Sequence, residues 1–206
     1  EKYKVEAWYD GNLVASDSNV QVDKDAGGTC TLTASVSSKG SIQVSVKYPD
    51  GSAVTPETAI LYDSSWNEKS RQTPNSNTFT FSNLEPGTYN VEVYKDDMWI
   101  GVSESISVQA GQTVSKTITT LNKRDLTVTV YYNDGSTPLS GATIKVYSWD
   151  GYNGRWNYRY SDMTDSNGKS SFSLWPTSKS GEKYKVEAWY DGNLVASDSN
   201  VQVDKD

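Results

Sequence analysis

The sequence predicts an all-β protein made of tandem seven-stranded β-sandwich domains. Apolar and polar residues alternate in short runs such as SIQVSVK (41–47) and DLTVTV (125–130), and this period of two places one face of each strand in a core. Turn sequences such as PDGS, NDGS and YDGN separate the runs, with Gly or Asn residues that tolerate a positive φ. No segment keeps the 3.6-residue period of an amphipathic helix, so we expect strands throughout.

The strand runs assign the core faces in order along the chain. In the run that begins at residue 41, Ile42, Val44 and Val46 share one face, and Gln43 and Ser45 share the other. The same parity predicts the remaining inward-facing residues: Tyr89, Val91, Val93, Leu126, Val128, Val130, Tyr184 and Val186.

Composition excludes several classes of site. The 206 residues include 26 acidic and 19 basic side chains, a net charge of −7, with no His and one Cys. A chain without His has no Ser-His-Asp triad and no imidazole metal ligand, and one Cys forms no internal disulfide. The acidic balance argues against a nucleic-acid partner, and no run approaches the ~20 apolar residues of a membrane span. We expect no catalytic residue, no cofactor, no metal site and no enzymatic activity.

A long exact repeat organises the chain. Residues 1–25 and 182–206 are the same 25 letters, EKYKVEAWYDGNLVASDSNVQVDKD. The simplest interpretation is a window cut from a longer tandem array with a period of 181 residues. A designed chain, or a strand-donating subunit with matched ends, would look similar and is less favoured.

A weaker repeat divides this period into two domains. SIQVSVKYPDGS (41–52) parallels DLTVTVYYNDGS (125–136), and residues 88–108 parallel residues 183–203. We therefore predict three parts. Residues 1–36 are the closing strands of a preceding domain copy, residues 37–121 form domain A, and residues 122–206 form domain B.

Domain B is predicted to lack its last strand. Domain A closes with TVSKTITT (113–120), whose counterpart is TCTLTASV (29–36). The next repeat, or residues 26–36 of a neighbouring chain, would supply the missing strand, because an open sheet edge is a template for pairing. Its core face is predicted from parity: Cys30, Leu32, Ala34 and Val36.

The motifs resemble a known family. Pro138, Leu139, Gly141 and Ala142, with the TDSNG segment (164–168), carry half of its pattern in domain B, and the LEPGTY segment (84–89) carries the other half in domain A. The pattern resembles carboxypeptidase regulatory-like domains, and also collagen-adhesin B-type stalk domains. The resemblance implies a transthyretin-like or Ig-like sandwich, used as a serial or accessory module of secreted and surface proteins, and it brings no active site.

An intramolecular Lys–Asn isopeptide bond is a hypothesis that parity disfavours. Lys47, Glu92 and Asn122 have a suggestive order, but Lys47 and Glu92 fall on the faces opposite the core residues of their strands. We expect both side chains to point to solvent, whereas this bond needs a buried trio. The acidic turns at Asp96–Asp97 and Asp162–Asn167 lack any calcium-loop spacing, and turn chemistry explains them.

An aromatic insert at residues 147–160 is the strongest candidate for recognition. Its rings beside Arg residues suit stacking on sugars, or packing against a neighbouring domain or chain. We favour packing, since aromatic anchors more often serve interfaces. The candidate interface or glycan-stacking residues are Trp149, Tyr152, Arg155, Trp156, Tyr158 and Tyr160.

The sequence thus favours a structural protein of the extracellular space or the prokaryotic cell surface. It would form a surface fibre, filament or adhesin stalk whose units join head to tail, with copies of itself as partners. The first alternative is a carbohydrate-binding surface module that uses residues 147–160. The second is an accessory domain of a secreted hydrolase.

Overall fold

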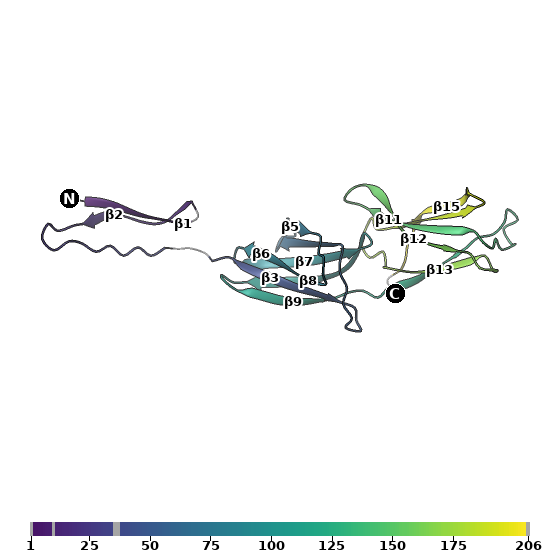
Figure 1. The fold of residues 1–206 in the computed structure, drawn as a ribbon, viewed down its shortest axis with the longest axis horizontal. Coiled ribbons are helices and arrows are strands. Elements are labelled where there is room, and N and C mark those ends of the chain that lie inside the picture. The colour runs from purple at the N-terminus through teal and green to yellow at the C-terminus, as the bar shows by residue number, and fades with distance from the viewer. Residues whose placement is uncertain (1, 10, 35–37, 205–206) are drawn as a thin grey trace.

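The computed structural model describes residues 2–9, 11–34 and 38–204, and within them it contains fifteen strands and no helix. The chain is therefore all-β, as the alternating sequence predicts. Three bodies follow one another in Figure 1: an N-terminal hairpin and two β-sandwiches.

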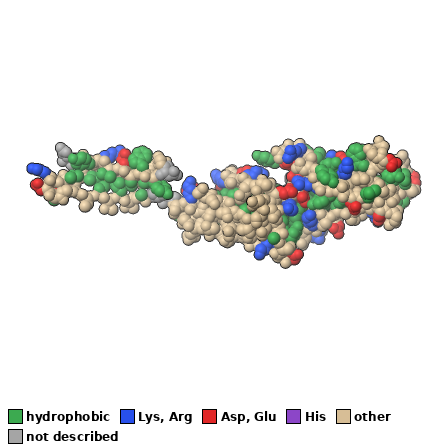
Figure 2. Space-filling model, viewed as in Figure 1, with side chains coloured by type: hydrophobic (Ala, Val, Ile, Leu, Met, Phe, Trp, Pro, Cys, Tyr) green, Lys and Arg blue, Asp and Glu red, His purple; other side chains and the backbone are tan. Residues whose placement is uncertain are grey.

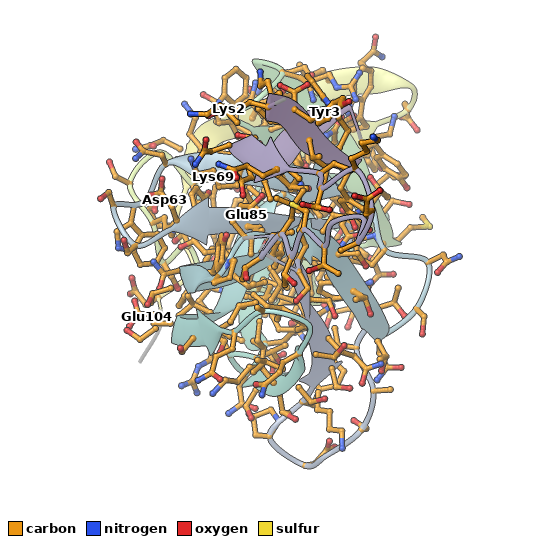
Figure 3. The ribbon with its side chains drawn as sticks, turned by 90° about the vertical axis from the view of Figure 1, so that its left-hand side faces the viewer. Lys2, Tyr3, Asp63, Lys69, Glu85 and Glu104 are labelled. Carbon is orange, nitrogen blue, oxygen red and sulfur yellow. The ribbon has the colours of Figure 1, made fainter. Side chains whose placement is uncertain are left out.

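The N-terminal hairpin pairs β1 (Lys2–Tyr9) with β2 (Asn12–Gln21) and joins no other sheet. It lies apart from both sandwiches (Figure 1). Its aromatic side chains are exposed to a large extent: Tyr3 is 47% exposed, and Trp8 is 62% exposed. Figure 3 shows Lys2 and Tyr3 on this hairpin at the near end of the molecule.

The first sandwich has seven strands in two sheets. The three-stranded sheet has the order β6-β3-β9, in which β9 runs parallel to β3, and the four-stranded sheet has the order β5-β4-β7-β8. The strands are β3 (Gly40–Lys47), β4 (Thr58–Asp63), β5 (Glu68–Gln72), β6 (Thr78–Leu84), β7 (Gly87–Lys95), β8 (Met98–Val108) and β9 (Thr113–Thr119).

The second sandwich repeats this arrangement with one strand fewer among the described residues. A pair, β10-β13, faces a four-stranded sheet of order β12-β11-β14-β15. The strands are β10 (Arg124–Thr129), β11 (Thr143–Asp150), β12 (Arg155–Met163), β13 (Lys169–Leu174), β14 (Tyr184–Tyr190) and β15 (Asn193–Val201).

The core lies on the faces that parity predicts. Ile42, Val44 and Val46 are fully buried, as are Val91 and Val93 across the sandwich. In the second sandwich Val130, Tyr184 and Val186 are buried, while Leu126 and Val128 are only partly buried. β3 and β10 occupy matching places in the sequence repeat, and both have an apolar face. The difference in burial between Ile42 and Val44 on β3 and Leu126 and Val128 on β10 therefore comes from the neighbouring strands.

The duplicated segments adopt the same hairpin, as predicted. In β1–β2, Tyr3 pairs with Val20, Val5 with Asp17 and Trp8 with Leu13. The pairs at the corresponding positions of β14–β15 are Tyr184–Val201, Val186–Asp198 and Trp189–Leu194, with bulges at the same places. The register is therefore a property of the local sequence. Burial does not follow from the local sequence, because Tyr3 is 47% exposed and its counterpart Tyr184 is fully buried.

The segment predicted as a closing strand is extended but unpaired in this chain. Residues 28–34 belong to no strand, Cys30 and Ala34 are exposed, and Leu32 is partly buried. The expectation that these side chains complete the core of a neighbouring domain stays a prediction, because in this chain the segment runs alongside its own β1–β2 hairpin (Figure 1). Val36, the fourth member of the set, lies outside the described residues.

Candidate functional site

The two sandwiches meet at a polar joint centred on Arg159 of β12. Its guanidinium lies 2.8 Å from the Asp97 carboxylate, 3.1 Å from Glu57 and 3.7 Å from Asp96, and its side chain is only 15% exposed. Figure 2 shows red and blue side chains gathered where the sandwiches meet. The guanidinium of Arg159, in the second sandwich, thus forms ion pairs with three carboxylates of the first sandwich.

The geometry of the β7–β8 turn aims these carboxylates. Asp96 and Asp97 are its two central residues, with φ of 52° and 63°. A positive φ at both central positions is characteristic of a type I′ turn, whose geometry matches the twist of the two strands in a hairpin. The equivalent turn of β14–β15 uses Asp191 and Gly192, with Gly at the second position. Asp97 has the positive φ that normally favours Gly. Unlike Gly, it carries a carboxylate, which contacts the second sandwich from this position.

Hydrogen bonds complete the joint. The Ser148 hydroxyl and the Asn157 amide donate to Asp97 at 2.6 and 2.9 Å, and the Tyr160 hydroxyl donates to Asp96 at 2.6 Å. Burial and the bond to Asp96 raise the pKa of Tyr160. Burial lowers the pKa of the Arg159 guanidinium, whereas the hydrogen bond to Asp97 and the negative charges of the three carboxylates raise it. The net effect is a raised pKa. Arg159 therefore keeps its positive charge at the centre of the joint.

Glu92 corrects one expectation from the sequence. Parity places it on the sheet face opposite the core, and we expected solvent there, but it is only 5% exposed. Lys179 of the second sandwich covers it as an ion-pair partner, and the Tyr94 hydroxyl donates a hydrogen bond of 2.7 Å. Lys47 is exposed as predicted, and Asn122 is exposed too, so the three residues form no buried trio.

Glu182 forms a second bridge between the sandwiches. Its carboxylate accepts hydrogen bonds from the backbone N–H groups of Trp99, at 2.6 Å, and of Ser178 and Lys179, at 2.7 and 2.8 Å. Burial raises the pKa of Glu182 despite these donors. The loop that precedes β14 is thereby attached to the first residues of β8.

A cleft of about 760 Å³ lies beside this joint. Tyr62, Arg71 and Tyr94 line it from the first sandwich, and Trp149, Tyr152 and Lys179 are among the residues that line it from the second. The Arg71 guanidinium stacks over the Tyr152 ring at 4.3 Å from its centroid, a cation–π contact between the sandwiches.

The structure divides the predicted aromatic set between two surroundings. Tyr160 turns into the joint, while Tyr152 at the cleft and Tyr158 on the outer face are 75% and 55% exposed. Trp149 and Trp156 form a cross-strand pair at 5.1 Å with planes tilted by 61°. Arg155 is exposed beside Asp150 at 3.7 Å. The set therefore includes both packing and exposed rings.

Two lysine residues at the start of β14, one just before the strand and one within it, are functional candidates that the sequence reasoning missed. Lys183 lies over the rings of Trp149 and Trp156, at 5.3 and 5.6 Å, and Lys185 lies 4.2 Å from the ring centroid of Tyr147. Their alternation with Tyr184 and Val186 was the available signal, because it places them opposite the core on the same side as the rings. The result is a surface of alternating rings and ammonium groups.

The acidic turns are occupied by turn hydrogen bonds. Asp165 accepts from the backbone N–H groups of Asn167 and Lys169, and Asp162 accepts from the Ser170 hydroxyl. Within the described residues no group of three His, Cys, Asp or Glu side chains is arranged to hold a metal ion. The same part of the chain has no helix that could cross a membrane.

One family model matches part of the chain. Residues 63–116 match domain II of polysaccharide lyase family 4, a segment of the first sandwich. The comparison with curated proteins gives no match.

Solved structures with a similar build include two streptococcal pilins and the TIE protein of Bacillus anthracis. The streptococcal ancillary pilin is 11% identical, with 96% of this chain and 72% of the pilin covered and a TM-score of 0.40. The minor pilin of Streptococcus agalactiae is 13% identical, with 80% and 92% covered and a TM-score of 0.39. The Bacillus anthracis TIE protein is 19% identical, with 82% of this chain covered and a TM-score of 0.34. This chain spans 32% of the TIE protein's length. Likenesses of this degree carry no argument about function.

Proposed function

We propose that this chain is a structural unit of an extracellular fibre, filament or adhesin stalk on a prokaryotic cell surface, with its units joined head to tail. It acts as a mechanical spacer and not as an enzyme, and it needs no cofactor. The single observation that carries the proposal is the joint at Arg159, which fixes one sandwich against the next through buried charge.

A fixed joint is what a spacer requires. Two sandwiches on a free linker would bend independently, whereas ionic, aromatic and backbone contacts between them resist bending. Arg159, Glu182 and the Lys179–Glu92 pair form three separate bridges. The 25-residue repeat supports a head-to-tail series, because residues 1–25 and 182–206 have the same sequence and their described strands pair in the same register.

The test measures stiffness in single chains. In Arg159→Ala the carboxylates of Glu57, Asp96 and Asp97 lose their cation, and we expect the distribution of distances between the sandwiches to broaden. Spin or dye labels placed on exposed positions of each sandwich would report this distribution, and small-angle scattering would report the overall length. The matched control is Arg155→Ala, on the same hairpin but exposed. Equal rigidity of both variants would contradict the spacer proposal.

A carbohydrate-binding role is the second candidate, supported by the exposed rings of Tyr152 and Tyr158 and by the Trp149–Trp156 pair. Flat aromatic faces stack on sugar rings. Titration calorimetry with soluble cell-wall polysaccharides would test it, with Trp156→Ala as the variant and Trp66→Ala, an exposed ring of the first sandwich, as the control. Heat that Trp156→Ala abolishes and Trp66→Ala leaves would support this role. The absence of heat with every polysaccharide would count against it.

An accessory role beside a secreted hydrolase is the third proposal. The match of residues 63–116 to a polysaccharide lyase domain supports it, and the resemblance of the turn motifs to carboxypeptidase regulatory-like domains suits either role. The exact repeat at the two ends favours the serial arrangement over this one.

A further inference from the structure

A groove of about 370 Å³ runs along the second sandwich between β10 and the β14–β15 hairpin. Within the part of the chain that the structure describes, β10 pairs with β13 alone, so the backbone on its other edge has no strand beside it. The groove is mainly apolar, and its lining includes Leu126, Val128, Val130, Val186, Ala196 and Val201.

The equivalent groove of the first sandwich is filled by β9. There β3 lies between β6 and β9, and its side chains Ile42 and Val44 are fully buried. The sequence repeat matches them to Leu126 and Val128, which are only partly buried. Ile100 of β8 is likewise fully buried, and its match Val195 is 48% exposed. The second sandwich is therefore shaped for one more strand.

We propose that residues 29–34 of a second copy of this chain occupy this groove as a strand parallel to β10. The proposal deepens the head-to-tail arrangement proposed above and rests on it. Residues 29–34 follow β2 as β9 follows β8, and β2 has the same sequence as β15, the strand that borders the groove. The segment therefore has the sequence context of a closing strand for the second sandwich.

The register of the incoming strand follows from the first sandwich. Ile42 pairs with Val114, Val44 with Lys116 and Val46 with Ile118. The sequence repeat matches β3 to β10 and β9 to the segment that begins at residue 29. When this register is transferred to the second sandwich, Cys30 lies beside Leu126, Leu32 beside Val128 and Ala34 beside Val130. In β9 these alternate positions are the inward ones, and Ile118 is 1% exposed. The segment places Leu32 where β9 has Lys116, so its inward face is apolar.

Side-chain size matches this segment to this groove. In the first sandwich a Cβ added to Gly101 would lie 2.7 Å from Cγ2 of Ile118, so a large residue of β9 requires Gly on β8. The second sandwich has Ala196 at the position of Gly101, which leaves no room for an Ile. The segment has Ala34 at the position of Ile118. The pair of Gly101 and Ile118 in the first sandwich is thus replaced by Ala196 and Ala34, whose side chains are compatible in size.

The segment before β3 cannot reach the groove of its own copy. Ala34, the last described residue of the segment, lies six residues before Gly40, a distance of at most ~22 Å in an extended chain. β3 then carries the chain roughly 26 Å away at ~3.3 Å per residue. The second sandwich begins beyond the far end of β3, where Lys47 pairs with Thr119. Figure 1 shows residues 29–34 and β13 on opposite sides of the first sandwich. Residues 29–34 of the same copy therefore cannot reach the groove, whereas those of a second copy can.

Cysteine cross-linking in the full chain tests the position and the register. Cys30 is the sole Cys and is exposed, so Leu126→Cys adds one thiol at its expected neighbour. Mild oxidation should then give a ladder of head-to-tail multimers on a non-reducing denaturing gel. The matched control is Glu104→Cys, an exposed position on β8 of the first sandwich, which should give no ladder above the level of random collisions.

A size swap tests the specificity. Ala34→Ile should clash with Ala196 and weaken assembly by about tenfold, the factor that about 1.4 kcal/mol gives. The double variant Ala34→Ile with Ala196→Gly recreates the pair of the first sandwich and should restore assembly. Residue 34 is exposed in the single chain, so Ala34→Ile should leave the fold intact, as circular dichroism would verify. Sedimentation velocity over a concentration series would report the masses.

Two outcomes would overturn the proposal. One is a chain that keeps the mass of a single copy at every concentration and forms no ladder with Leu126→Cys. The other is an Ala34→Ile variant that assembles as well as the unsubstituted chain. Neither outcome affects the stiffness measurement on Arg159, which uses single chains, so failure of the strand exchange and failure of the spacer role are distinguishable.

Discussion

Carboxylates of this chain differ in whether their partners are local or distant. Asp63 is held within its own turn by the backbone N–H groups of Ser65 and Asn67, at 2.9 and 3.0 Å, and by the Lys69 ammonium at 3.2 Å. Figure 3 shows Asp63 and Lys69 close together at this turn. Glu92, by contrast, depends on Lys179, which lies in the other sandwich. Only the first kind of partner is visible in a short stretch of sequence.

The first prediction concerns Asp63 and acid. The hydrogen bonds from Asn67, with help from Lys69 and Ser65, lower the pKa of Asp63 from its ordinary 3.8 to about 2. A lowered pKa stabilises the fold above the ordinary value, and this stabilisation is lost as the pH falls from 3.8 through about 2. Asp63→Asn should therefore melt at a lower temperature than the parent at pH 7, with a gap that closes near pH 2.

Thermal melts at pH 7, 4 and 2 would measure this gap, with Glu104→Gln as the control at an exposed position. A gap that stays constant with pH would contradict the role of the Asp63 charge.

The β7–β8 turn shows how one element differs from its repeat. Both hairpins place two residues of positive φ between their strands, but β7–β8 uses Asp96–Asp97 and β14–β15 uses Asp191–Gly192. Asp97 receives hydrogen bonds from Ser148 and Asn157. The strained turn is thus associated with contacts outside its own hairpin, as expected where local strain serves a joint.

The second prediction concerns this turn. Asp97→Gly relieves backbone strain in the hairpin but removes the ion pair to Arg159, whose side chain is 15% exposed. Because the loss of one partner of a buried pair outweighs the relief, we expect the free energy of unfolding to fall by about 2 kcal/mol. Chemical denaturation would measure it.

The matched control places the same turn sequence in the other hairpin, β14–β15. Gly192→Asp recreates the Asp–Asp sequence in β14–β15 and should cost only about 1 kcal/mol from backbone strain. If Asp97→Gly stabilised the protein, the contacts of Asp97 across the joint would be of no energetic value.

At the scale of the whole molecule, a continuous core joins the two sandwiches. Trp175 of the second is fully buried, and its ring stacks on Tyr48 of the first at 5.7 Å with an interplanar angle of 7°. The hydroxyl of Tyr184, also fully buried, donates to the Trp175 carbonyl at 2.9 Å. The hydrophobic contact and the ionic joint together couple the unfolding of one sandwich to that of the other.

The third prediction concerns this coupling. Trp175→Ala leaves a cavity between the sandwiches and should cost about 3–5 kcal/mol. We expect calorimetry to show one transition for the parent and two for the variant. Trp189→Ala, on the outer face of β14, is the control and should keep a single transition. Two transitions in the parent would show that the sandwiches already unfold independently.

The sequence predicted much of the fold because the relevant signals are local. Alternation assigned Ile42, Val44 and Val46 to the core, and all three are fully buried. The repeat predicted that β1–β2 and β14–β15 share a register, and they do. The candidate site was less accessible. Tyr160 and Trp149 were identified as interface or stacking residues, but Arg159 at the centre of the joint was not among the predicted site residues.

What the sequence determined by itself is therefore which face of each strand lies in a core and how each hairpin pairs, because parity and turn type act over a few residues. What only the tertiary structure decided is the fate of the outer faces. Glu92 was expected in solvent and is buried, since Lys179, far along the chain, covers it. Leu126 and Val128 were expected in a core and are partly open, since among the described residues β10 has only β13 beside it and its other edge is unpaired. Burial of a surface depends on which distant segment packs on it, and alternation carries no information about that.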